Sequence, residues 1–343
     1  MGIRTLDGNN SSNNLQATKT KIRLWWDRWD SWEIRGFGGD DYIVGGEKSD
    51  KLYGGDGGDT IHGLDGNDTI WGDRSGESGV DFLYGGDGND KLYGGNGDDE
   101  LYGGKNNDVL YGGRGADLLV GGSGSDTYYS YNFDGVSFQD TIVEEAVGGY
   151  DTLYTNVDVA LPDNVEKLVV FGGTGSTGIG NDLHNTMDGW LFDDTLHGKG
   201  GTDFLDGGLG NDHLDGGDST DFLYGGQGSD TLVGGDGHDF LTGYDKGVNE
   251  RDVMTGGKHA DTFYLAHGAG YTNISYMDGG FATITDFSSA EGDKVVLAGS
   301  MGIYTREFKG GDTHLLRSGN LIAIIENTNA STFSMVDDVT YYS

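Results

Sequence analysis

Side chains that can bind a cation recur along this chain, mostly nine residues apart. Nineteen positions follow the pattern, eighteen of them aspartate and one asparagine. The first run comprises Asp41, Asp50, Asp59, Asp68, Asp81, Asp90, Asp99, Asp108, Asp117 and Asp126, and the second comprises Asn185, Asp194, Asp203, Asp212, Asp221, Asp230, Asp239, Asp252 and Asp261. Oxygen ligands without histidine or cysteine favour calcium, whose coordination is flexible, over magnesium, which requires a strict octahedron. The spacing therefore predicts rows of calcium sites.

Each of these residues ends a glycine-rich turn, as in GGDGNDKLY at 85–93. Glycine supplies the positive φ angles that tight turns need. A six-residue turn followed by a three-residue strand makes half a coil, so two repeats complete one turn of a flattened parallel helix. Repeats n and n+2 then stack on one edge and can share an ion. Ten repeats and nine repeats give eight and seven such pairs, which predicts up to about 15 calcium ions.

An apolar residue follows each aspartate position by two residues. Because side chains alternate along a strand, this residue is predicted to point inward. The predicted apolar column comprises Ile43, Leu52, Ile61, Ile70, Leu83, Leu92, Leu101, Leu110, Leu119, Tyr128, Met187, Leu196, Leu205, Leu214, Leu223, Leu232, Leu241, Met254 and Phe263. Two units, 72–84 and 243–255, contain four extra residues before the aspartate, which we expect on the surface of the turn. Four turns replace their second conserved glycine and are expected to bind more weakly: Lys48, Asn106, Ser219 and His259.

These features predict an all-β chain with two parallel β-rolls, at 36–129 and 180–264. Residues 130–179 lack glycine turns and are interpreted as a β-structured linker. Residues 265–343 contain alternating apolar segments and are predicted to form a β cap. Residues 1–35 contain a polar stretch, interpreted as a degenerate first repeat, and then a tryptophan-rich, basic segment that we interpret as an N-terminal cap.

Composition limits the ways in which this chain can be stabilised. Of 343 residues, 67 are glycine and none is cysteine, so disulfides and thiolate metal sites are excluded. Acidic residues number 57 against 21 lysines and arginines, for a net charge of -36, which disfavours a compact state unless cations neutralise it and makes nucleic acid an unsuitable partner. We therefore expect calcium binding to supply much of the folding free energy. Apolar runs are too short for a membrane span, and the start MGIRTLDGNN has no hydrophobic region of a cleaved signal.

The repeats resemble the RTX, or hemolysin-type, calcium-binding repeats of bacterial proteins exported by type I secretion. The linker sequence at 140–170 resembles a module that sits between such repeats. The tail sequences at 260–265 and 282–300 are similar to C-terminal domains of these proteins, particularly cyanobacterial ones. The resemblance implies a calcium-bound β-roll, an uncleaved C-terminal secretion signal, the type I secretion machinery as a partner, and an extracellular or cell-surface location. That family also includes proteases, lipases and toxins. Because the chain contains neither HExxH nor GxSxG, we expect no enzymatic activity.

Two groups of aromatic residues leave the function open. Outward positions in the first roll carry Tyr53, Trp71, Tyr93, Tyr111 and Tyr129 on one face and His62, Tyr84 and Tyr102 on the other. These rows could bind sugars or another subunit, or they could simply suit exposed strands. The tryptophans Trp25, Trp26, Trp29 and Trp32 could cover the open end of the roll, or dock onto an acidic neighbouring molecule in head-to-tail assembly.

Three functions are compatible with these features. The leading hypothesis is a secreted, calcium-folded structural protein of the cell surface or matrix that assembles with copies of itself into filaments or a layer. The alternative is a calcium-stabilised adhesin or a glycan- or ice-binding module. An enzyme with an unrecognised site is the third, and the sequence contains no motif in its favour.

Overall fold

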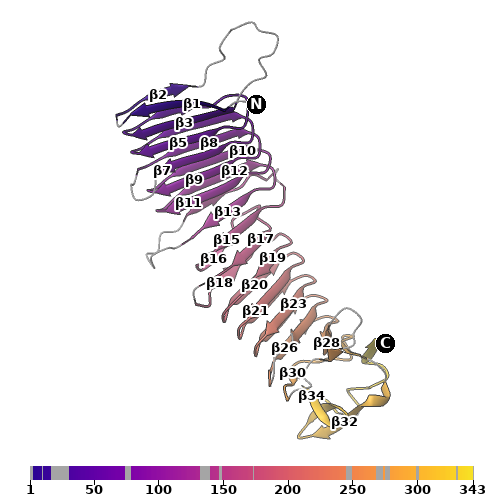
Figure 1. The fold of residues 1–343 in the computed structure, drawn as a ribbon. Coiled ribbons are helices and arrows are strands. Elements are labelled where there is room, and N and C mark those ends of the chain that lie inside the picture. Colours follow the sequence, from indigo (N-terminus) through magenta and orange to yellow (C-terminus); the bar gives the residue numbers. More distant parts are fainter. Residues whose placement is uncertain are drawn as a thin grey trace. The chain divides into compact units, whose positions relative to one another are not determined.

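The structure is a computed structural model. It describes residues 3–9, 11–16, 31–73, 79–131, 140–146, 149–172, 174–244, 249–267, 273–274, 279–298, 301–329 and 331–342. Contacts divide the chain into two compact units, the first comprising Met1–Asn156 and Pro162–Lys167 and the second Val157–Leu161 and Leu168–Ser343. The described residues contain no α-helix, and each unit is a parallel β-solenoid (Figure 1). The described residues contain no helix with the length and apolar character that a membrane span requires.

The first unit has two parallel sheets whose strands alternate along the chain. One sheet has the order β1 (Ile3–Asn9), β3 (Ser31–Gly38), β5 (Lys51–Asp56), β7 (Thr69–Asp73), β9 (Lys91–Asn96), β11 (Val109–Arg114), β13 (Thr127–Ser130) and β15 (Thr152–Thr155). The other has the order β2 (Asn14–Gln16), β4 (Tyr42–Val44), β6 (Thr60–Asp65), β8 (Phe82–Asp87), β10 (Glu100–Lys105), β12 (Leu118–Ser123) and β14 (Thr141–Val143). Each strand pairs with the strand two places along, which defines one coil.

The second unit repeats this arrangement. One sheet contains β17 (Lys167–Val170), β19 (Thr186–Asp188), β21 (Phe204–Leu209), β23 (Phe222–Gln227), β25 (Phe240–Tyr244), β27 (Thr262–Tyr264), β31 (Lys294–Ala298) and β35 (Val339–Tyr342). The other contains β16 (Val159–Ala160), β18 (Thr177–Ile179), β20 (Thr195–Gly200), β22 (His213–Asp218), β24 (Thr231–Asp236), β26 (Val253–Lys258), β30 (Ala282–Ile284), β34 (Asn320–Ile325), β33 (Asp312–Arg317) and β32 (Tyr304–Lys309).

The core of each unit is the predicted apolar column. All nineteen of its residues have an exposed fraction of 0%. Neighbouring coils place these residues in register, as in Leu83 opposite Leu101 and Leu101 opposite Leu119. The register continues past both longer units, because Ile61 pairs with Leu83 and Leu232 with Met254. The predicted column is therefore confirmed.

Strands of the predicted linker continue the coils. β14 pairs in parallel with β12, and β15 pairs in parallel with β13. In the second unit, β18 pairs in parallel with β20. None of these three strands is followed by a glycine pair. β15 keeps the inward apolar residue, Leu153, which is fully buried, whereas β18 has Gly178 opposite Leu196. The division into an N-terminal cap, two β-rolls, a linker and a C-terminal cap stays a prediction.

Both ends of the chain contribute further strands. Near the start, Leu15 of β2 pairs with Ile43, as expected for a degenerate first repeat. Trp25, Trp26 and Trp29 lie outside the described residues, whereas Trp32 lies within β3 and its backbone N–H donates to Asp50 Oδ1 over 2.6 Å. Toward the other end, β32, β33 and β34 form an antiparallel meander. The remaining elements are the antiparallel pair β28 (Ala266–His267) and β29 (Asn273–Ile274), and the 3-10 turn η1 (Met301–Ile303).

Candidate calcium centre

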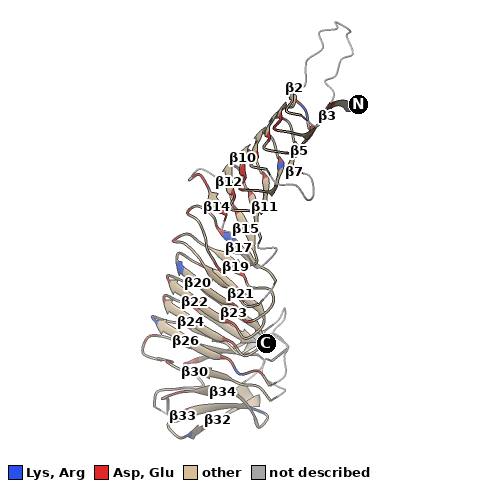
Figure 2. Ribbon diagram, turned by 90° about the vertical axis from the view of Figure 1, so that its left-hand side faces the viewer, with Lys and Arg blue, Asp and Glu red and all other residues tan. Residues whose placement is uncertain are grey.

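Glycine turns bring the predicted ligand residues to the edges of the sheets. The second and fourth turn positions adopt positive φ, as in Gly95 (124°) and Gly97 (146°). Three of the four replacements at the fourth position keep this conformation: Asn106 at 70°, Ser219 at 88° and His259 at 79°. A left-handed conformation costs a non-glycine residue about 1–2 kcal/mol. These turns therefore keep the shape of the others at some cost in stability. In Figure 2, acidic residues recur along the turns of each unit.

One carboxylate oxygen of each aspartate connects successive coils. The backbone N–H of Asp90 donates to Asp108 Oδ1 over 2.7 Å, and the N–H of Asp108 donates to Asp126 Oδ1 over the same distance. The second unit has the same pattern, for instance from the N–H of Asp203 to Asp221 Oδ1 over 2.8 Å. The nineteen predicted residues are all buried, with exposed fractions of 3% or less.

The other carboxylate oxygen, Oδ2, is buried and receives no hydrogen bond from the described part of the chain in sixteen of the nineteen, all except Asp50, Asn185 and Asp252. The surroundings of Asp108 show why. A Cβ added at Gly103, the first residue of the same turn, would lie 2.5 Å from Asp108 Oδ2 and 2.7 Å from the Gly121 carbonyl oxygen. Two acceptors from neighbouring coils thus face one point.

Burial shifts the acidity of these carboxyl groups. Loss of solvation raises the pKa of Asp68, Asp81 and Asp108 to about 8. The same cause raises the pKa of Asp90 and Asp203 to about 6, where the backbone N–H that each accepts partly offsets it. A buried anionic oxygen without a partner costs free energy unless a proton or a metal ion neutralises it.

The donor set fits a hard divalent cation. It consists of carboxylate and carbonyl oxygens, repeated coil by coil along the turns, which is the chemistry that calcium prefers. Magnesium requires a regular octahedron that a row of backbone turns does not readily supply. The aspartates would hold the ion and balance its charge.

Comparison with known proteins agrees with this geometry. The model of the RTX calcium-binding nonapeptide repeat matches residues 35–70, 75–110, 93–128, 178–214, 188–223 and 215–245. The chain is an RTX calcium-binding repeat protein. RTX nonapeptide repeats bind calcium, and the solenoid of stacked half-coils described above is consistent with a β-roll.

No curated protein matches this RTX protein. Eleven chains of solved structures do, among them the extracellular lipase LipA from Serratia marcescens. The identity to LipA is 16%, the match covers 91% of this chain and 45% of LipA, and the TM-score is 0.16. This RTX protein thus spans less than half the length of LipA. At this TM-score, the similarity to LipA says nothing about function.

Three aspartates occupy ligand positions that the sequence analysis missed, and Glu166, whose Oε2 accepts from the Asp151 N–H, is a fourth acidic residue of this kind. The N–H of Asp117 donates to Asp140 Oδ1, that of Asp126 to Asp151 Oδ1, and that of Asp261 to Asp293 Oδ1. Separations of 23, 25 and 32 residues conceal them from a search at nine-residue spacing. The signal that remains is the aspartate two residues before a buried or half-buried apolar side chain, as in DTI at 140–142, DTL at 151–153 and DKV at 293–295.

The aromatic rows of this RTX protein stack ring on ring. Centroids of Tyr93 and Tyr111 lie 4.7 Å apart with planes 7° from parallel, and those of Tyr111 and Tyr129 lie 4.2 Å apart at 6°. The second row stacks likewise, with Tyr84 and Tyr102 5.0 Å apart. Since each ring covers the faces of its neighbours, the interior of a row presents ring edges and hydroxyls. Sugars usually need an exposed ring face, so stacking between coils accounts for these rows more directly.

Proposed function

We propose that this RTX protein is a non-enzymatic structural protein of the cell surface or extracellular matrix, which folds when it binds calcium. The observation that carries the proposal is the row of buried Oδ2 atoms that receive no hydrogen bond within the described residues. A chain with a net charge of -36 cannot bury these carboxylates at low free-energy cost without counter-ions.

Folding that depends on calcium suits a protein that is exported in an unfolded state. Cytosolic calcium is too low to fill the turns, so the chain stays extended and can pass a type I secretion channel. Outside the cell, calcium fills the turns. It stabilises the folded state, because a ligand that binds only the folded chain shifts the folding equilibrium toward that state. Up to about 15 ions would bind if every pair of stacked repeats holds one.

Assembly into filaments or a layer is the second part of the proposal. Within the described residues, the sheets end at β1, β2 and β14 in the first unit and at β16, β32 and β35 in the second. A terminal strand presents unpaired backbone groups to which another chain can add. Electron microscopy of the calcium-loaded protein over a range of concentrations tests this part, which dispersed monomers at every concentration would contradict.

Circular dichroism tests the folding part. We expect the β-sheet signal to be lost in excess EGTA and to return on addition of calcium, with no return on addition of the same concentration of magnesium. A β-sheet signal that persists unchanged in EGTA would refute the proposal.

One observation favours glycan binding as a second candidate function. A pocket of about 560 Å³ lies at the start of the first aromatic row, where Arg35, Tyr53, Trp71 and Asp73 contribute to its lining. Because Trp71 is stacked between Tyr53 and Tyr93, a sugar here would contact the charged groups and the ring edges of the pocket rather than a ring face. Replacing Trp71 with alanine should abolish binding to a glycan array while Tyr111→Ala retains it. Equal binding by both variants would exclude this pocket.

A further inference from the structure

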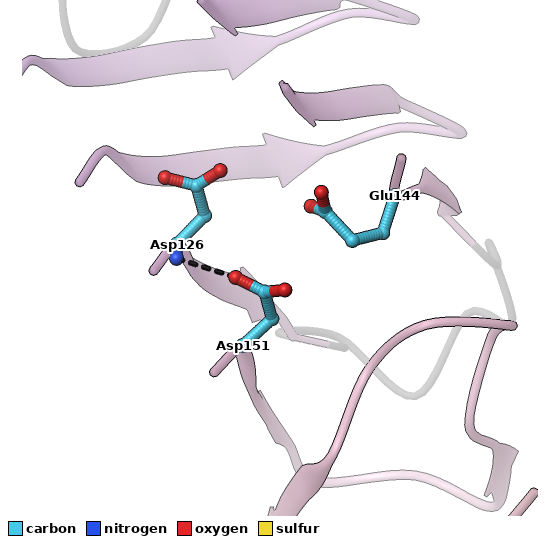
Figure 3. Close-up of side chains that lie close together, drawn as sticks. All are labelled: Asp126, Glu144 and Asp151. Atoms are coloured by element: carbon cyan, nitrogen blue, oxygen red, sulfur yellow. Dashed lines mark hydrogen bonds between the residues drawn. The ribbon is translucent and has the colours of Figure 1, made fainter. Parts of the chain in front are cut away.

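Three buried carboxylates converge in the first unit at a place where the nonapeptide pattern has ended. Asp126, Glu144 and Asp151 each offer an oxygen, and these three atoms lie within 4.8 Å of one another. Their exposed fractions are 1%, 7% and 1%. Figure 3 shows the three side chains directed toward a common space.

The three residues come from different parts of the sequence. Asp126 ends the first run of repeats and precedes β13, and Asp151 precedes β15, the next strand of that sheet. The N–H of Asp126 donates to Asp151 Oδ1 over 2.6 Å, so the two belong to one row of aspartates. Glu144 directly follows β14 on the opposite sheet, at the position that Gly121, the first glycine of its turn, holds after β12. The fold alone brings it to the row.

Two buried oxygens of this cluster lack hydrogen-bond donors among the described residues. Asp126 Oδ2 and Asp151 Oδ2 receive no hydrogen bond from any described residue. Glu144 Oε1 accepts from the backbone N–H of Glu145 over 2.9 Å, and Glu144 Oε2 accepts from the hydroxyl of Tyr128. Two unpartnered anionic oxygens beside a third carboxylate are the environment of a bound cation.

Tyr128 and Gly121 adapt this coil to the cluster. Tyr128 occupies the apolar column, where every other repeat of the first run has leucine or isoleucine, and its hydroxyl is directed at Glu144. A Cβ added at Gly121 would lie 2.6 Å from Glu144 Oε2 and would also collide with Asp126 Oδ2 and the Tyr128 hydroxyl. Oxygens from three side chains therefore surround a space that only glycine leaves open.

We infer that Asp126, Glu144 and Asp151 form a calcium site of a different composition from the repeat sites. Three carboxylates at one site supply more negative charge than a pair of stacked turns, in which each turn contributes one aspartate. This site therefore binds calcium more tightly. Tyr128 is a positioning residue that orients Glu144. The bound ion joins the coils of β13, β14 and β15, and so fixes the end of the first unit where the glycine turns stop.

Calcium titration of the full chain against a fluorescent chelator tests the inference. The wild-type chain should show one ion bound more tightly than the rest. Glu144→Gln and Asp151→Asn should each weaken binding of this ion at least tenfold and leave the weaker class unchanged, since losing even an outer-shell partner of a metal ligand typically costs tenfold to a hundredfold in affinity. Glu145→Gln removes the same charge from the adjacent, exposed residue and should bind like the wild type.

Terbium gives a second measurement that does not depend on the stability of the Glu144 variant. One equivalent of Tb³⁺ should emit strongly on tyrosine excitation, because the phenol of Tyr128 lies beside the site. Tyr128→Phe should lose most of this emission and keep the emission excited directly at the ion. Full tyrosine-sensitised emission from Tyr128→Phe, or unchanged calcium affinity in Glu144→Gln, would overturn the inference. A chain that binds no calcium at all would overturn the proposed function as well, whereas loss of the tight ion alone leaves that function intact.

Discussion

Replacing Asp108 with asparagine should have opposite consequences with and without calcium. Asparagine keeps the oxygen that accepts from the Asp90 N–H. It replaces the buried Oδ2 with an NH₂ group, next to which the Gly121 carbonyl can accept. The substitution removes one anionic ligand and also one buried negative charge, and these two effects have different signs.

The magnitudes follow from the two costs. At free calcium a hundredfold above the dissociation constant, one bound ion stabilises the folded state by about 2.7 kcal/mol, so losing it should lower the free energy of unfolding by about that amount. At vanishing calcium, giving a buried, unpartnered acceptor a donor instead should relieve about 1–3 kcal/mol. The difference between variant and wild type should therefore shrink and then reverse as calcium falls.

Urea unfolding followed by circular dichroism measures both effects at a series of buffered calcium concentrations, down to the lowest at which the chain is still folded. Asp98→Asn is the matched control, because Asp98 lies in the same kind of turn but is exposed, with its Oδ1 accepting from the Ala116 N–H. The control should be nearly neutral throughout. An Asp108→Asn effect of the same size and sign at every calcium concentration would refute the reasoning.

Three further predictions concern the turns and their protons. Burial raises the pKa of many repeat aspartates from 3.8 to between about 6 and about 8, so the calcium-free folded chain binds more protons than the unfolded chain in that range. The stability of the calcium-free folded chain should be highest below pH 4 and should fall as the pH rises to 8, whereas calcium affinity should weaken from pH 8 to pH 5. Circular dichroism across pH measures the stability, and calcium titration across pH measures the affinity. Curves that do not depend on pH would contradict both expectations. Gly103→Ala should cost about 1–3 kcal/mol in urea unfolding, since its Cβ would press on Asp108 Oδ2, whereas Gly302→Ala, which meets no atom within 4 Å, should be near neutral. Phe192→Gly should raise the unfolding free energy by about 1 kcal/mol, because Phe192 is exposed and holds a φ of 80°; a loss would show that its ring contributes more than the strain costs.

Much of the fold could be predicted from the sequence because the repeat fixes register locally. Nine residues make half a coil, so the position of Leu101 within its repeat decides both its inward direction and its partners Leu83 and Leu119. The burial of the aspartates follows from the same register. Even the two longer units preserve it, since their extra residues precede the aspartate.

The linker could not be predicted in this way. Its strands at 141–143 and 152–155 are not followed by glycine pairs, and the intervals before Asp140 and Asp151 vary, so no period identifies them. The cluster at Glu144 was missed for a related reason. Its members share no spacing, and only the pairing of β14 with β12 and of β15 with β13 brings them together.

The position of calcium in a crystal of the calcium-loaded protein tests the central claim most directly. Anomalous scattering collected at a wavelength where calcium contributes would locate each ion without assumptions about the chain. The account predicts peaks in rows along the turns, beside the Oδ2 atoms of aspartates such as Asp59, Asp108 and Asp221. An intact solenoid whose turns contain no ions would contradict it.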